Sequence, residues 1–384
     1  MVARRRRGNA QHGEYGGVID PLVPDYGGRC ITGLAPALVG VQPVDWLPEP
    51  VAGADAVVLL ALDGLGADAV RSHAHEIPTL AGLSGEPITT VAPSTTASAL
   101  TSLATGLAPS QHGLVGFRMR VDGSVLNVLR WPTGGRAPDP FDVQRHDAFL
   151  GRPVPVVTRR EFLHTGFTDA QLRGTRFVGW STVSALIVHC RRVVAAGERL
   201  VYAYYPGVDT VAHEHGLQSD FYRAELRAAD ALVAGMLDAL PESAALLVTS
   251  DHGQVQIEPE SWIELTALEP LIDMQAGDAR FRYLYAKPGA ATELAESAHG
   301  EVGAHAWVLT REQLLDEGWL GPRPTGSIGG RIGDVVLAAR DPVGFVDPAL
   351  PQEATLLAMH GSLTPDEMQV PLLAGRGRAR SKAG

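Results

Sequence analysis

Three apolar segments, each followed by an aspartate, constrain the fold of this chain more than any other feature. The first, AVVLLALDGLG, runs from Ala56 to Gly66 and carries Asp63 near its end. An unbroken apolar run ending in Asp-Gly predicts a buried parallel strand whose carboxyl end delivers Asp63 to a loop. Ligands of open α/β sheets bind at such ends, so Asp63 is a candidate site residue. It could equally cap a helix that we expect to begin near Ala67.

The second segment is the predicted strand Arg199–Tyr205, which leads into the loop sequence YYPGVDTVAHEHG. Asp209 and His213 are four residues apart, so in a helix both side chains can face the same point. One carboxylate and one imidazole at this spacing suit a metal ion. His215 lies two residues further on and would face elsewhere, so we leave it outside the predicted site.

The third segment is the predicted strand Ala244–Thr249, which is followed by Ser250, Asp251, His252 and Gly253. Adjacent Asp and His side chains cannot share one face of a helix, but both can reach inward from a tight turn, which Gly253 permits. Because the carboxyl ends of parallel strands lie at one edge of a sheet, the three aspartates are predicted to converge.

A cluster of hydroxyl residues follows a further predicted strand, Ile88–Ala92, in the stretch VAPSTTASALTSLATGLAPSQHG. Pro93 ends this strand, and we expect a helix over residues 97–105. The N–H groups at the start of a helix form a ready site for an anion. Thr96 is the candidate nucleophile here, provided that another group activates its hydroxyl, which is inert at neutral pH.

The remaining pattern predicts an α/β fold with a mostly parallel central sheet flanked by helices, and a small inserted cap subdomain. The further expected elements are a hairpin over Phe117–Trp131, helices over Val183–Ala196 and Ser219–Leu240, a strand over Asp334–Ala339 that returns to the main sheet, and a closing segment over Met368–Leu373. The predicted divisions are a basic disordered start with an extended lead-in (1–50), the main domain (51–374, with the cap-like insertion at about 255–333) and a disordered basic tail (375–384).

Charge and composition limit the partners of the chain. It has 384 residues and a formal net charge of -11, but eight positive charges lie in the two tails, so the body carries about -19. Such an acidic body argues against nucleic acid as the main partner. No apolar segment reaches the roughly 18 residues that cross a bilayer, so we expect no membrane partner. Two cysteines give no disulfide framework, and the expected location is cytoplasmic. The oligomeric state stays open.

The candidate residues at the strand ends point to a metal site. Three carboxylates that converge without cations would repel one another and raise their pKa values, a cost that two divalent ions remove. Mixed nitrogen and oxygen ligands suit zinc best, with manganese as the alternative. Two such ions about 4 Å apart form a clamp for in-line phosphoryl transfer and can lower the pKa of a threonine hydroxyl. The candidate residues are Asp63, Thr96, Asp209, His213, Asp251, His252 and His360.

The dispersed motifs resemble those of the alkaline phosphatase superfamily, and most closely its nucleotide pyrophosphatase/phosphodiesterase branch. The nucleophile segment of that branch has a proline, a threonine three residues on, Thr-Gly nine further, and then His-Gly. Here these are Pro93, Thr96, Thr105-Gly106 and His112-Gly113, so the register selects Thr96 over Ser94 or Thr95. The LLALDG, PGVDTVAH and SDHG segments, and His360 before a glycine, resemble the other motifs across 56–373.

The resemblance implies two metal sites and a covalent mechanism. One divalent ion would be held by Asp63, Thr96, Asp251 and His252, and the other by Asp209, His213 and His360. It implies hydrolysis of phosphodiester or pyrophosphate bonds through a phosphothreonine on Thr96, with a small phosphorylated substrate such as a nucleotide.

The chain departs from that branch at one position beside the nucleophile. Three residues after the threonine the branch carries an asparagine that hydrogen-bonds a phosphoryl oxygen, whereas this chain has Ala99, preceded by Ser98. Since an alanine side chain donates nothing, either Ser98 or a backbone N–H would stabilise the transition state, or the preferred substrate differs.

Two alternatives therefore remain open. A phosphomonoesterase or phosphonate hydrolase could use the same site, with an added cation from Arg118, Arg120, Arg130 or Lys287 for the extra charge of a monoester. A non-catalytic family member would bind a metal or ligand without turnover, and Ala99 is the only feature that favours it.

Overall fold

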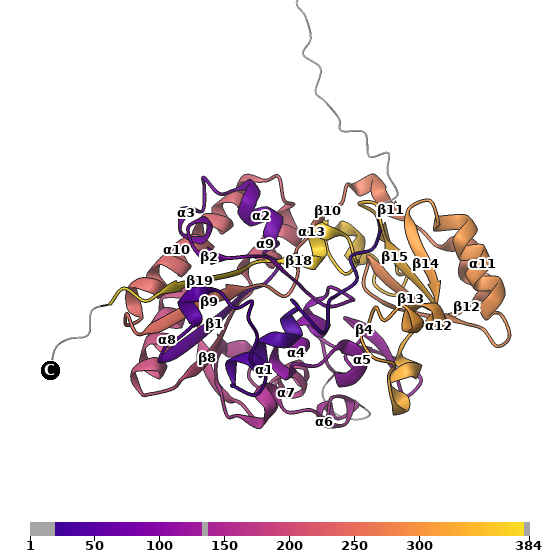
Figure 1. The fold of residues 1–384 in the computed structure, drawn as a ribbon. Helices are drawn as coiled ribbons and strands as arrows, with labels where there is room; N and C mark the ends of the chain where they lie inside the picture. Colours follow the sequence, from indigo (N-terminus) through magenta and orange to yellow (C-terminus); the bar gives the residue numbers. More distant parts are fainter. Residues whose placement is uncertain (1–19, 133–136, 380–384) are drawn as a thin grey trace, which may run out of the picture.

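A seven-stranded sheet forms the centre of the structure, a computed structural model that describes residues 20–132 and 137–379 (Figure 1). Five neighbouring strands are parallel, and the two strands at one edge run antiparallel to their neighbours. In spatial order the strands are β2 (Ser84–Gly85), β19 (Leu372–Arg376), β9 (Ala244–Thr249), β1 (Ala56–Leu62), β8 (Leu200–Tyr205), β6 (Pro155–Arg159) and β7 (Arg176–Trp180). The prediction of a mostly parallel α/β fold is confirmed.

Helices cover both faces of this sheet. The α-helices are α1 (Leu34–Leu38), α2 (Ala67–Ser72), α3 (Pro78–Ala81), α4 (Thr96–Thr105), α5 (Pro109–His112), α6 (Pro140–Val143), α7 (Gly166–Gln171), α8 (Val183–Ala195), α9 (Gly207–His215), α10 (Asp220–Ala239), α11 (Ala291–Val302), α12 (Arg311–Asp316) and α13 (Pro365–Met368). Shorter 3₁₀ segments are η1 (Ile31–Gly33), η2 (Glu49–Val51), η3 (Ala148–Gly151), η4 (Arg160–Phe162), η5 (Pro259–Ser261), η6 (Thr266–Leu271), η7 (Gly326–Arg331) and η8 (Pro351–Thr355). No helix in the described ranges is long and apolar enough to span a bilayer.

Strand β1 is buried on both faces because alternate side chains enter two separate apolar clusters. Val58 and Leu60 pack in one cluster with residues of α8 and α10. Val57 and Leu59 pack in the other with residues of α4 and the lead-in. This explains why the sequence of β1 is continuously apolar rather than alternating. The two clusters define helix, sheet and helix layers.

Sheet pairing brings the three predicted aspartate loops to one edge. Strand β1 lies between β8 and β9, with Leu62 opposite Tyr205 and Ala61 opposite Thr249. The loops after these three strands therefore start at the same level of the sheet. The predicted convergence at the carboxyl edge is what parallel pairing in this register produces.

A smaller antiparallel sheet stands beside the central sheet, at the right of Figure 1 in orange. Its strands, in spatial order, are β12 (Ile272–Gly277), β13 (Phe281–Ala286), β15 (Val335–Ala339) and β14 (Ala306–Thr310). Short two-stranded pairs accompany the two main sheets: β10 (Val255–Gln256) with β17 (Ala358–Met359), β11 (Trp262–Ile263) with β16 (Gly344–Phe345), β18 (Gln369–Val370) with β3 (Ile88–Thr89), and β4 (Arg118–Val121) with β5 (Ser124–Asn127).

The prediction that the strand over Asp334–Ala339 returns to the main sheet is wrong. Strand β15 pairs with β13 and β14 in the smaller sheet. Its alternate residues are buried in two different apolar clusters, one on each face. An apolar pattern buried on both faces is equally typical of a central parallel strand, so the sequence did not distinguish the two.

Two further expectations need correction at the ends of the described chain. The lead-in expected to be extended contains η1 and α1, and its residues Ile31 and Leu34 are fully buried against the central sheet. The tail expected to be disordered from residue 375 begins inside β19, which pairs with β9 through Arg376. Burial of apolar residues stabilises the lead-in, and hydrogen bonds within the sheet stabilise the start of the tail. The expected disorder of residues 1–19 and 380–384 lies outside the described residues.

The two cysteines are free thiols buried at different places. Cys30 packs in the lead-in cluster and Cys190 in the α8 cluster. The other predicted elements, namely the Phe117–Trp131 hairpin and the helices α4, α8 and α10, are confirmed within a few residues. Ser219 caps α10 by accepting a hydrogen bond from the N–H of Tyr222 at 3.1 Å.

A buried ion pair joins the smaller sheet to α13. Arg280 and Glu367 are both fully buried, and the guanidinium donates from Nε to Oε1 at 2.7 Å and from Nη2 to Oε2 at 2.9 Å. The carbonyl of Glu367 also accepts a hydrogen bond from the N–H of Gly253 at 2.9 Å. The pair therefore links the smaller sheet to the loop that carries His252.

Glu367→Ala is expected to lower the free energy of unfolding by about 3–5 kcal/mol, because it leaves the Arg280 guanidinium buried without its counter-charge. The control is Asp68→Ala, which breaks the exposed Asp68–Arg71 pair and should cost less than about 1 kcal/mol. Urea unfolding followed by circular dichroism measures both. Equal losses in the two variants would show that the buried pair contributes no more than a surface pair.

Candidate active site

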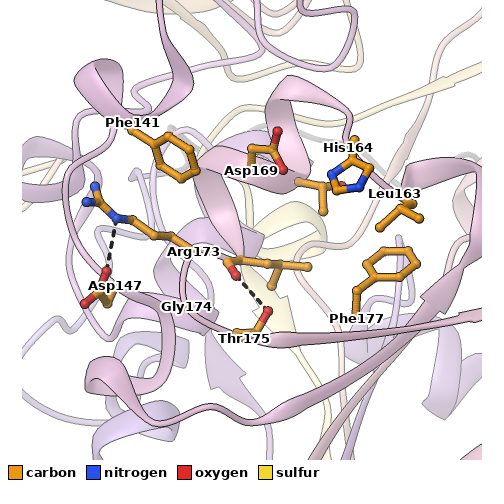
Figure 2. Close-up of a pocket in the computed structure, with 11 residues that line it drawn as sticks. Phe141, Asp147, Leu163, His164, Asp169, Arg173, Gly174, Thr175 and Phe177 are labelled. Atoms are coloured by element: carbon orange, nitrogen blue, oxygen red, sulfur yellow. Dashed lines mark hydrogen bonds and ion pairs between the residues drawn. The ribbon is translucent and has the colours of Figure 1, made fainter.

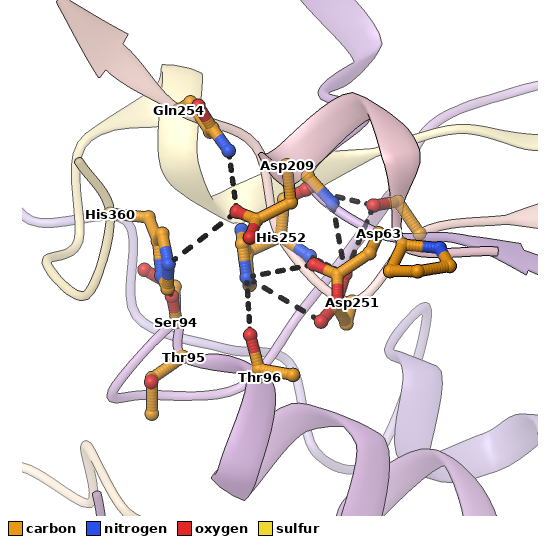
Figure 3. A network of polar contacts seen from close by, with 12 residues as sticks. Asp63, Ser94, Thr95, Thr96, Asp209, Asp251, His252, Gln254 and His360 are labelled. Atoms are coloured by element: carbon orange, nitrogen blue, oxygen red, sulfur yellow. Dashed lines mark hydrogen bonds and ion pairs between the residues drawn. The ribbon is translucent and has the colours of Figure 1, made fainter. Parts of the chain in front are cut away.

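The predicted site residues come together at the carboxyl edge of the central sheet, and Figure 3 shows how all of them except His213 converge. Nε2 of His252 lies 3.2 Å from Oγ1 of Thr96, 3.5 Å from Oδ1 of Asp63 and 3.4 Å from Oδ2 of Asp251. The rings of His252 and His360 stack with centroids 3.5 Å apart. All of these groups are buried within one polar cluster.

Asp209 joins this cluster to the remaining histidine. Its Oδ1 lies 3.2 Å from Nε2 of His213 and 3.8 Å from Nε2 of His360. Both Asp209 and His213 lie on α9, one helical turn apart, as their spacing predicts. Two groups have ligand atoms close enough for one ion each: Asp209 with His213 and His360, and Asp63 with Asp209 and His252. Asp209 belongs to both, so it lies between two candidate metal positions.

Thr96 is the first residue of α4, where the side chain stands at the open end of the helix. Thr95 occupies the N-cap position, but its side chain does not cap the helix. The N–H groups of the first turn have no partner within a helix, so they remain available to an anion. A phosphoryl group beside Thr96 would thus meet both a hydroxyl and a helix N-terminus.

The three histidines present the same nitrogen to the cluster. Nδ1 of His213 donates to the carbonyl of Ala358 at 2.6 Å, and Nδ1 of His360 donates to the carbonyl of Ser94 at 2.8 Å. Nδ1 of His252 donates to the carbonyl of Gly253 at 3.0 Å. Because a carbonyl only accepts, each Nδ1 carries a proton, so in the neutral imidazole each Nε2 keeps a lone pair. Backbone acceptors on the outer nitrogen are typical of metal-binding histidines.

Unpartnered carboxylate oxygens show that the cluster fits cations. Oδ1 of Asp63 and Oδ2 of Asp251 are buried and have no hydrogen-bond partner in the part of the chain that the structure describes. Both face the lone pair on Nε2 of His252. Lone pairs that face one another in a buried site repel, and a positive ion between them removes that repulsion.

The electrostatics of the carboxylates agree with this fit. Burial, together with the charges of Asp251 and Asp209, holds the pKa of Asp63 well above its ordinary value. Burial also raises the pKa of Asp251. For Asp209, burial acts in the same direction, but the neighbouring imidazoles, His213 foremost, outweigh it and lower the pKa. Without cations Asp63 and Asp251 therefore hold a proton to higher pH than ordinary aspartates do, and metal binding would favour its release.

Two positioning residues were missed by the sequence analysis. The hydroxyl of Tyr204 donates to Oδ2 of Asp63, which leaves Oδ1 facing His252. The amide of Gln254 donates from Nε2 to Oδ1 of Asp209 at 2.6 Å. Gln254 directly follows the Ser250–Gly253 turn, a proximity that could have suggested it, whereas the apolar pattern of β8 contains no signal that sets Tyr204 apart.

Gly64 allows the loop after β1 to approach α9 closely. Its φ is +73°, and a Cβ there would lie 2.9 Å from the Cα of Asp209 and 2.6 Å from Nε2 of Gln254. Any larger residue would push Asp209 away from Asp63. Both residues of the Asp-Gly pair at the end of β1 therefore have a role: Asp63 supplies a carboxylate to the site, and Gly64 leaves room for Asp209.

A cavity of about 240 Å³ opens beside Thr96, Asp63 and Asp209. Its wall is mostly apolar and aromatic, with a few neutral hydroxyl and amide groups, and no Lys, Arg or His among the described residues that line it: Asp63, Thr96, Leu100, Leu129, Val156, Thr158, Phe162, Thr165, Phe167, Thr168, Gln171, Leu172, Tyr202, Tyr204, Pro206, Asp209 and Thr210. None of these residues comes from the inserted segment. The cavity therefore suits an uncharged, ring-bearing group next to the phosphoryl position.

Neither Ala99 nor Ser98 offers a donor to this cavity. Ala99 is fully buried in the apolar cluster under α4. The hydroxyl of Ser98 is also buried and donates to the carbonyl of Leu114 at 2.8 Å. The sequence left Ser98 or a backbone N–H as the donor to a phosphoryl oxygen in place of the missing asparagine. Of these, the backbone N–H groups at the start of α4 remain.

A second cavity, of about 480 Å³, lies on the other side of α7 and is shown in Figure 2. It shares Thr168 and Leu172 with the first cavity. Arg173 pairs with Asp147 at 3.1 Å along its wall. No residue of the predicted site lines it, so it lies next to the candidate active site without being part of it.

This fold, with such a cluster at the carboxyl edge of its sheet, is that of the metal-dependent hydrolases of phosphate esters. The profile of the type I phosphodiesterase/nucleotide pyrophosphatase family matches residues 57–363, and the chain belongs to that family. The resemblance stated from the motifs is thereby confirmed, and the protein is a hydrolase. No curated protein sequence matches the chain.

Solved structures share its fold at low sequence identity. Murine ectonucleotide pyrophosphatase/phosphodiesterase 5 is 16% identical with a TM-score of 0.66, and the human protein is 17% identical with a TM-score of 0.65. In both cases the match covers 85% of this chain and 90% of the other. An inactive threonine-to-alanine variant of the murine protein, in complex with AMP, is 15% identical with a TM-score of 0.63.

Proposed function

We propose that this protein hydrolyses phosphodiester or pyrophosphate bonds with two divalent metal ions and Thr96 as the nucleophile. The observation that carries the proposal is the position of Nε2 of His252, within 3.5 Å of the Thr96 hydroxyl and of two buried carboxylates. Asp63, Asp251 and His252 would hold one ion beside Thr96, and Asp209, His213 and His360 the other. Zinc is the metal that this mixed donor set favours, with manganese as the alternative.

The proposed reaction has two displacements at phosphorus. Thr96 Oγ1 attacks phosphorus, its O–P bond forms as the bond to the leaving group breaks, and the hydroxyl proton is released to solvent, which also protonates the leaving group where its oxygen is basic enough. Water then attacks the same phosphorus, the O–P bond to Thr96 breaks, and a proton from the water returns to Oγ1, which releases the phosphorylated product and restores the threonine. When bound, the two ions lower the pKa of the attacking group and neutralise charge on the opposing oxygen. The open N–H groups of α4 are suited to the phosphoryl oxygens.

The cavity favours a diester or pyrophosphate over a monoester. A monoester carries an additional negative charge, and no Lys, Arg or His is among the described residues that line the cavity. The arginines and lysine considered for this purpose are engaged elsewhere or lie outside it. Arg118 pairs with buried Asp347, Arg120 donates to the carbonyl of Gly330 at 3.0 Å, and Lys287 donates to the carbonyl of Pro270 at 2.6 Å.

The occupant of this cavity is proposed to be the nucleoside of a nucleotide substrate. The aromatic rings of Phe162 and Phe167 can contact a base, and Thr158 and Gln171 offer neutral hydrogen-bonding groups. AMP in the complex of the murine relative is consistent with such a ligand. We also propose that the protein is located in the cytoplasm.

A substrate panel tests the proposed bond specificity. With zinc or manganese, bis(p-nitrophenyl) phosphate is expected to react with a kcat/KM at least about 100-fold above that of p-nitrophenyl phosphate, because the described residues that line the cavity include no cation for the second charge. Leu129→Lys places a cation at the half-exposed mouth and should narrow this ratio. The third substrate in the panel is an aryl phosphonate, which tests for phosphonate hydrolysis.

Higher activity on the monoester or on the phosphonate would overturn the diester assignment while keeping the site. Binding of two metal equivalents without turnover of any ester would instead favour a non-catalytic family member. The retained cluster of Thr96, His252 and two unpartnered carboxylates makes turnover the expected result.

A further inference from the structure

The inserted segment does not line the cavity, but it contacts the residue next to the proposed nucleophile. Asp278, in the turn between β12 and β13 of the smaller sheet, is almost completely buried. Its Oδ1 accepts a hydrogen bond from Oγ1 of Thr95 at 2.7 Å, and its Oδ2 accepts one from the N–H of Phe117 at 3.3 Å. One carboxylate therefore connects the smaller sheet to the residue that precedes Thr96.

The Thr95 hydroxyl is used in an unusual way for an N-cap residue. An N-cap threonine normally accepts a hydrogen bond from an N–H of the first helical turn. Here Thr95 makes no such bond, and its hydroxyl donates to Asp278 instead. The consequence is twofold: the backbone that carries Thr96 is fixed, and the N–H groups of the first turn are left open towards the phosphoryl position.

The other side of the same segment is fixed by the loop that carries His360. The N–H of Ser94 donates to the carbonyl of Gly361 at 3.0 Å, and the Ser94 hydroxyl donates to the carbonyl of Ser362 at 2.7 Å. A Cβ on Gly361 would lie 3.1 Å from the Cβ of Asp278, so this loop also packs closely against the Asp278 side chain. Residues 94–96 are therefore held between a metal-binding loop and the smaller sheet.

We infer that Asp278 is a positioning residue, which sets the Thr96 hydroxyl and the first turn of α4 through its hydrogen bond to Thr95. This inference rests on the proposed role of Thr96. The smaller sheet then serves as a support for the nucleophile, and the cap-like insertion contributes to catalysis without lining the cavity.

Asp278 differs from an acid in a surface ion pair, because it is buried and its pKa is raised. Burial raises its pKa to about 7, although the hydrogen bond from Thr95 acts in the opposite direction. The charge of Arg282 lowers the pKa of Asp278, but Arg282 is already paired with Asp347 and Glu353. A buried carboxylate that has no counter-charge of its own among the described residues costs stability, so its presence here points to a role other than stability.

The test compares Thr95→Val, which removes the hydroxyl at nearly constant volume, with Thr95→Ser, which keeps it. In the zinc-loaded protein, Thr95→Val is expected to lower kcat on bis(p-nitrophenyl) phosphate by about 10- to 100-fold with KM changed much less, because a small displacement of the nucleophile is costly. Thr95→Ser should recover most of that loss. Orthovanadate, a mimic of the phosphoryl group in transfer, should bind about 10-fold more weakly to Thr95→Val.

Asp278→Leu and the double variant Thr95→Val/Asp278→Leu complete a thermodynamic cycle. If the two residues act through one bond, the double variant should lose little more kcat than either single variant. Zinc content and melting temperature are measured for every variant, and the expected zinc content is that of the wild type. If Asp278→Leu does not fold, the comparison of Thr95→Val with Thr95→Ser, in kcat and in vanadate binding, tests the inference without it.

Wild-type kcat and vanadate affinity in Thr95→Val would overturn the inference, as would a loss of kcat that only follows a loss of bound zinc. A wild-type protein that neither turns over a diester nor binds vanadate would instead contradict the proposed function. The two failures are thus distinguishable, because the second is seen before any variant is made.

Discussion

Thr96→Ala is expected to reduce diester hydrolysis by about four orders of magnitude or more, since the first displacement loses its attacking atom. Thr96 lies at the start of α4, and alanine is a good helix former, so the fold and the zinc content should stay close to those of the wild type. Steady-state kinetics with bis(p-nitrophenyl) phosphate measure the loss.

Thr96→Ser is the matched control, because it keeps the hydroxyl and should retain measurable turnover. A neighbouring hydroxyl gives a second control: Thr101 donates to the carbonyl of Ala97 at 2.7 Å within α4, away from the metal cluster. Thr101→Ala should leave kcat within about threefold of the wild type, as expected for a residue without contact to the reacting atoms. Full activity in Thr96→Ala would remove Thr96 from the mechanism.

Removal of the metal ions is expected to abolish turnover, and added zinc should restore it. The reason is that Asp63, Asp251 and His252 present lone pairs to one another and to Thr96, an arrangement that activates nothing without a cation. Each bound ion should also stabilise the fold by about 3–4 kcal/mol at zinc concentrations 100- to 1,000-fold above its dissociation constant. Dialysis against a chelator, followed by calorimetry and zinc titration, measures both effects.

Asp209→Asn tests the same prediction at a single residue. Asp209 belongs to both candidate metal groups, so its loss should weaken both sites and reduce kcat/KM by about 1,000-fold. Asp220→Asn on the next helix is the control, because that acid is exposed in an ion pair with Arg223 and should have little effect. Activity that survives complete removal of metal, confirmed by elemental analysis, would contradict the account.

The central sheet and its polar edge could be predicted because they depend on short-range patterns. Strands β1, β8 and β9 are continuously apolar, each is followed within a few residues by an aspartate, and parallel pairing alone then brings Asp63, Asp209 and Asp251 together. The spacing of Asp209 and His213 fixed their shared helix face in the same way.

The features that escaped prediction depend on contacts between distant parts of the chain. The apolar pattern of β15 was equally compatible with either sheet, and only its pairing with β13 and β14 decided the question. Tyr204, Gln254 and Asp278 act through partners 141, 45 and 183 residues away, and no local periodicity reports such contacts. Burial of Ser98 against the carbonyl of Leu114 was likewise invisible until α4 and its neighbours were placed.

The covalent role of a threonine makes a stereochemical prediction that other routes do not share. Two successive in-line displacements at phosphorus, first by Thr96 and then by water, return the original configuration, whereas direct attack by water inverts it. The most direct measurement is therefore hydrolysis of a phosphorothioate diester of single configuration in isotopically labelled water, with the product configuration determined by phosphorus NMR. Retention is the predicted result, and inversion would contradict a covalent intermediate on Thr96.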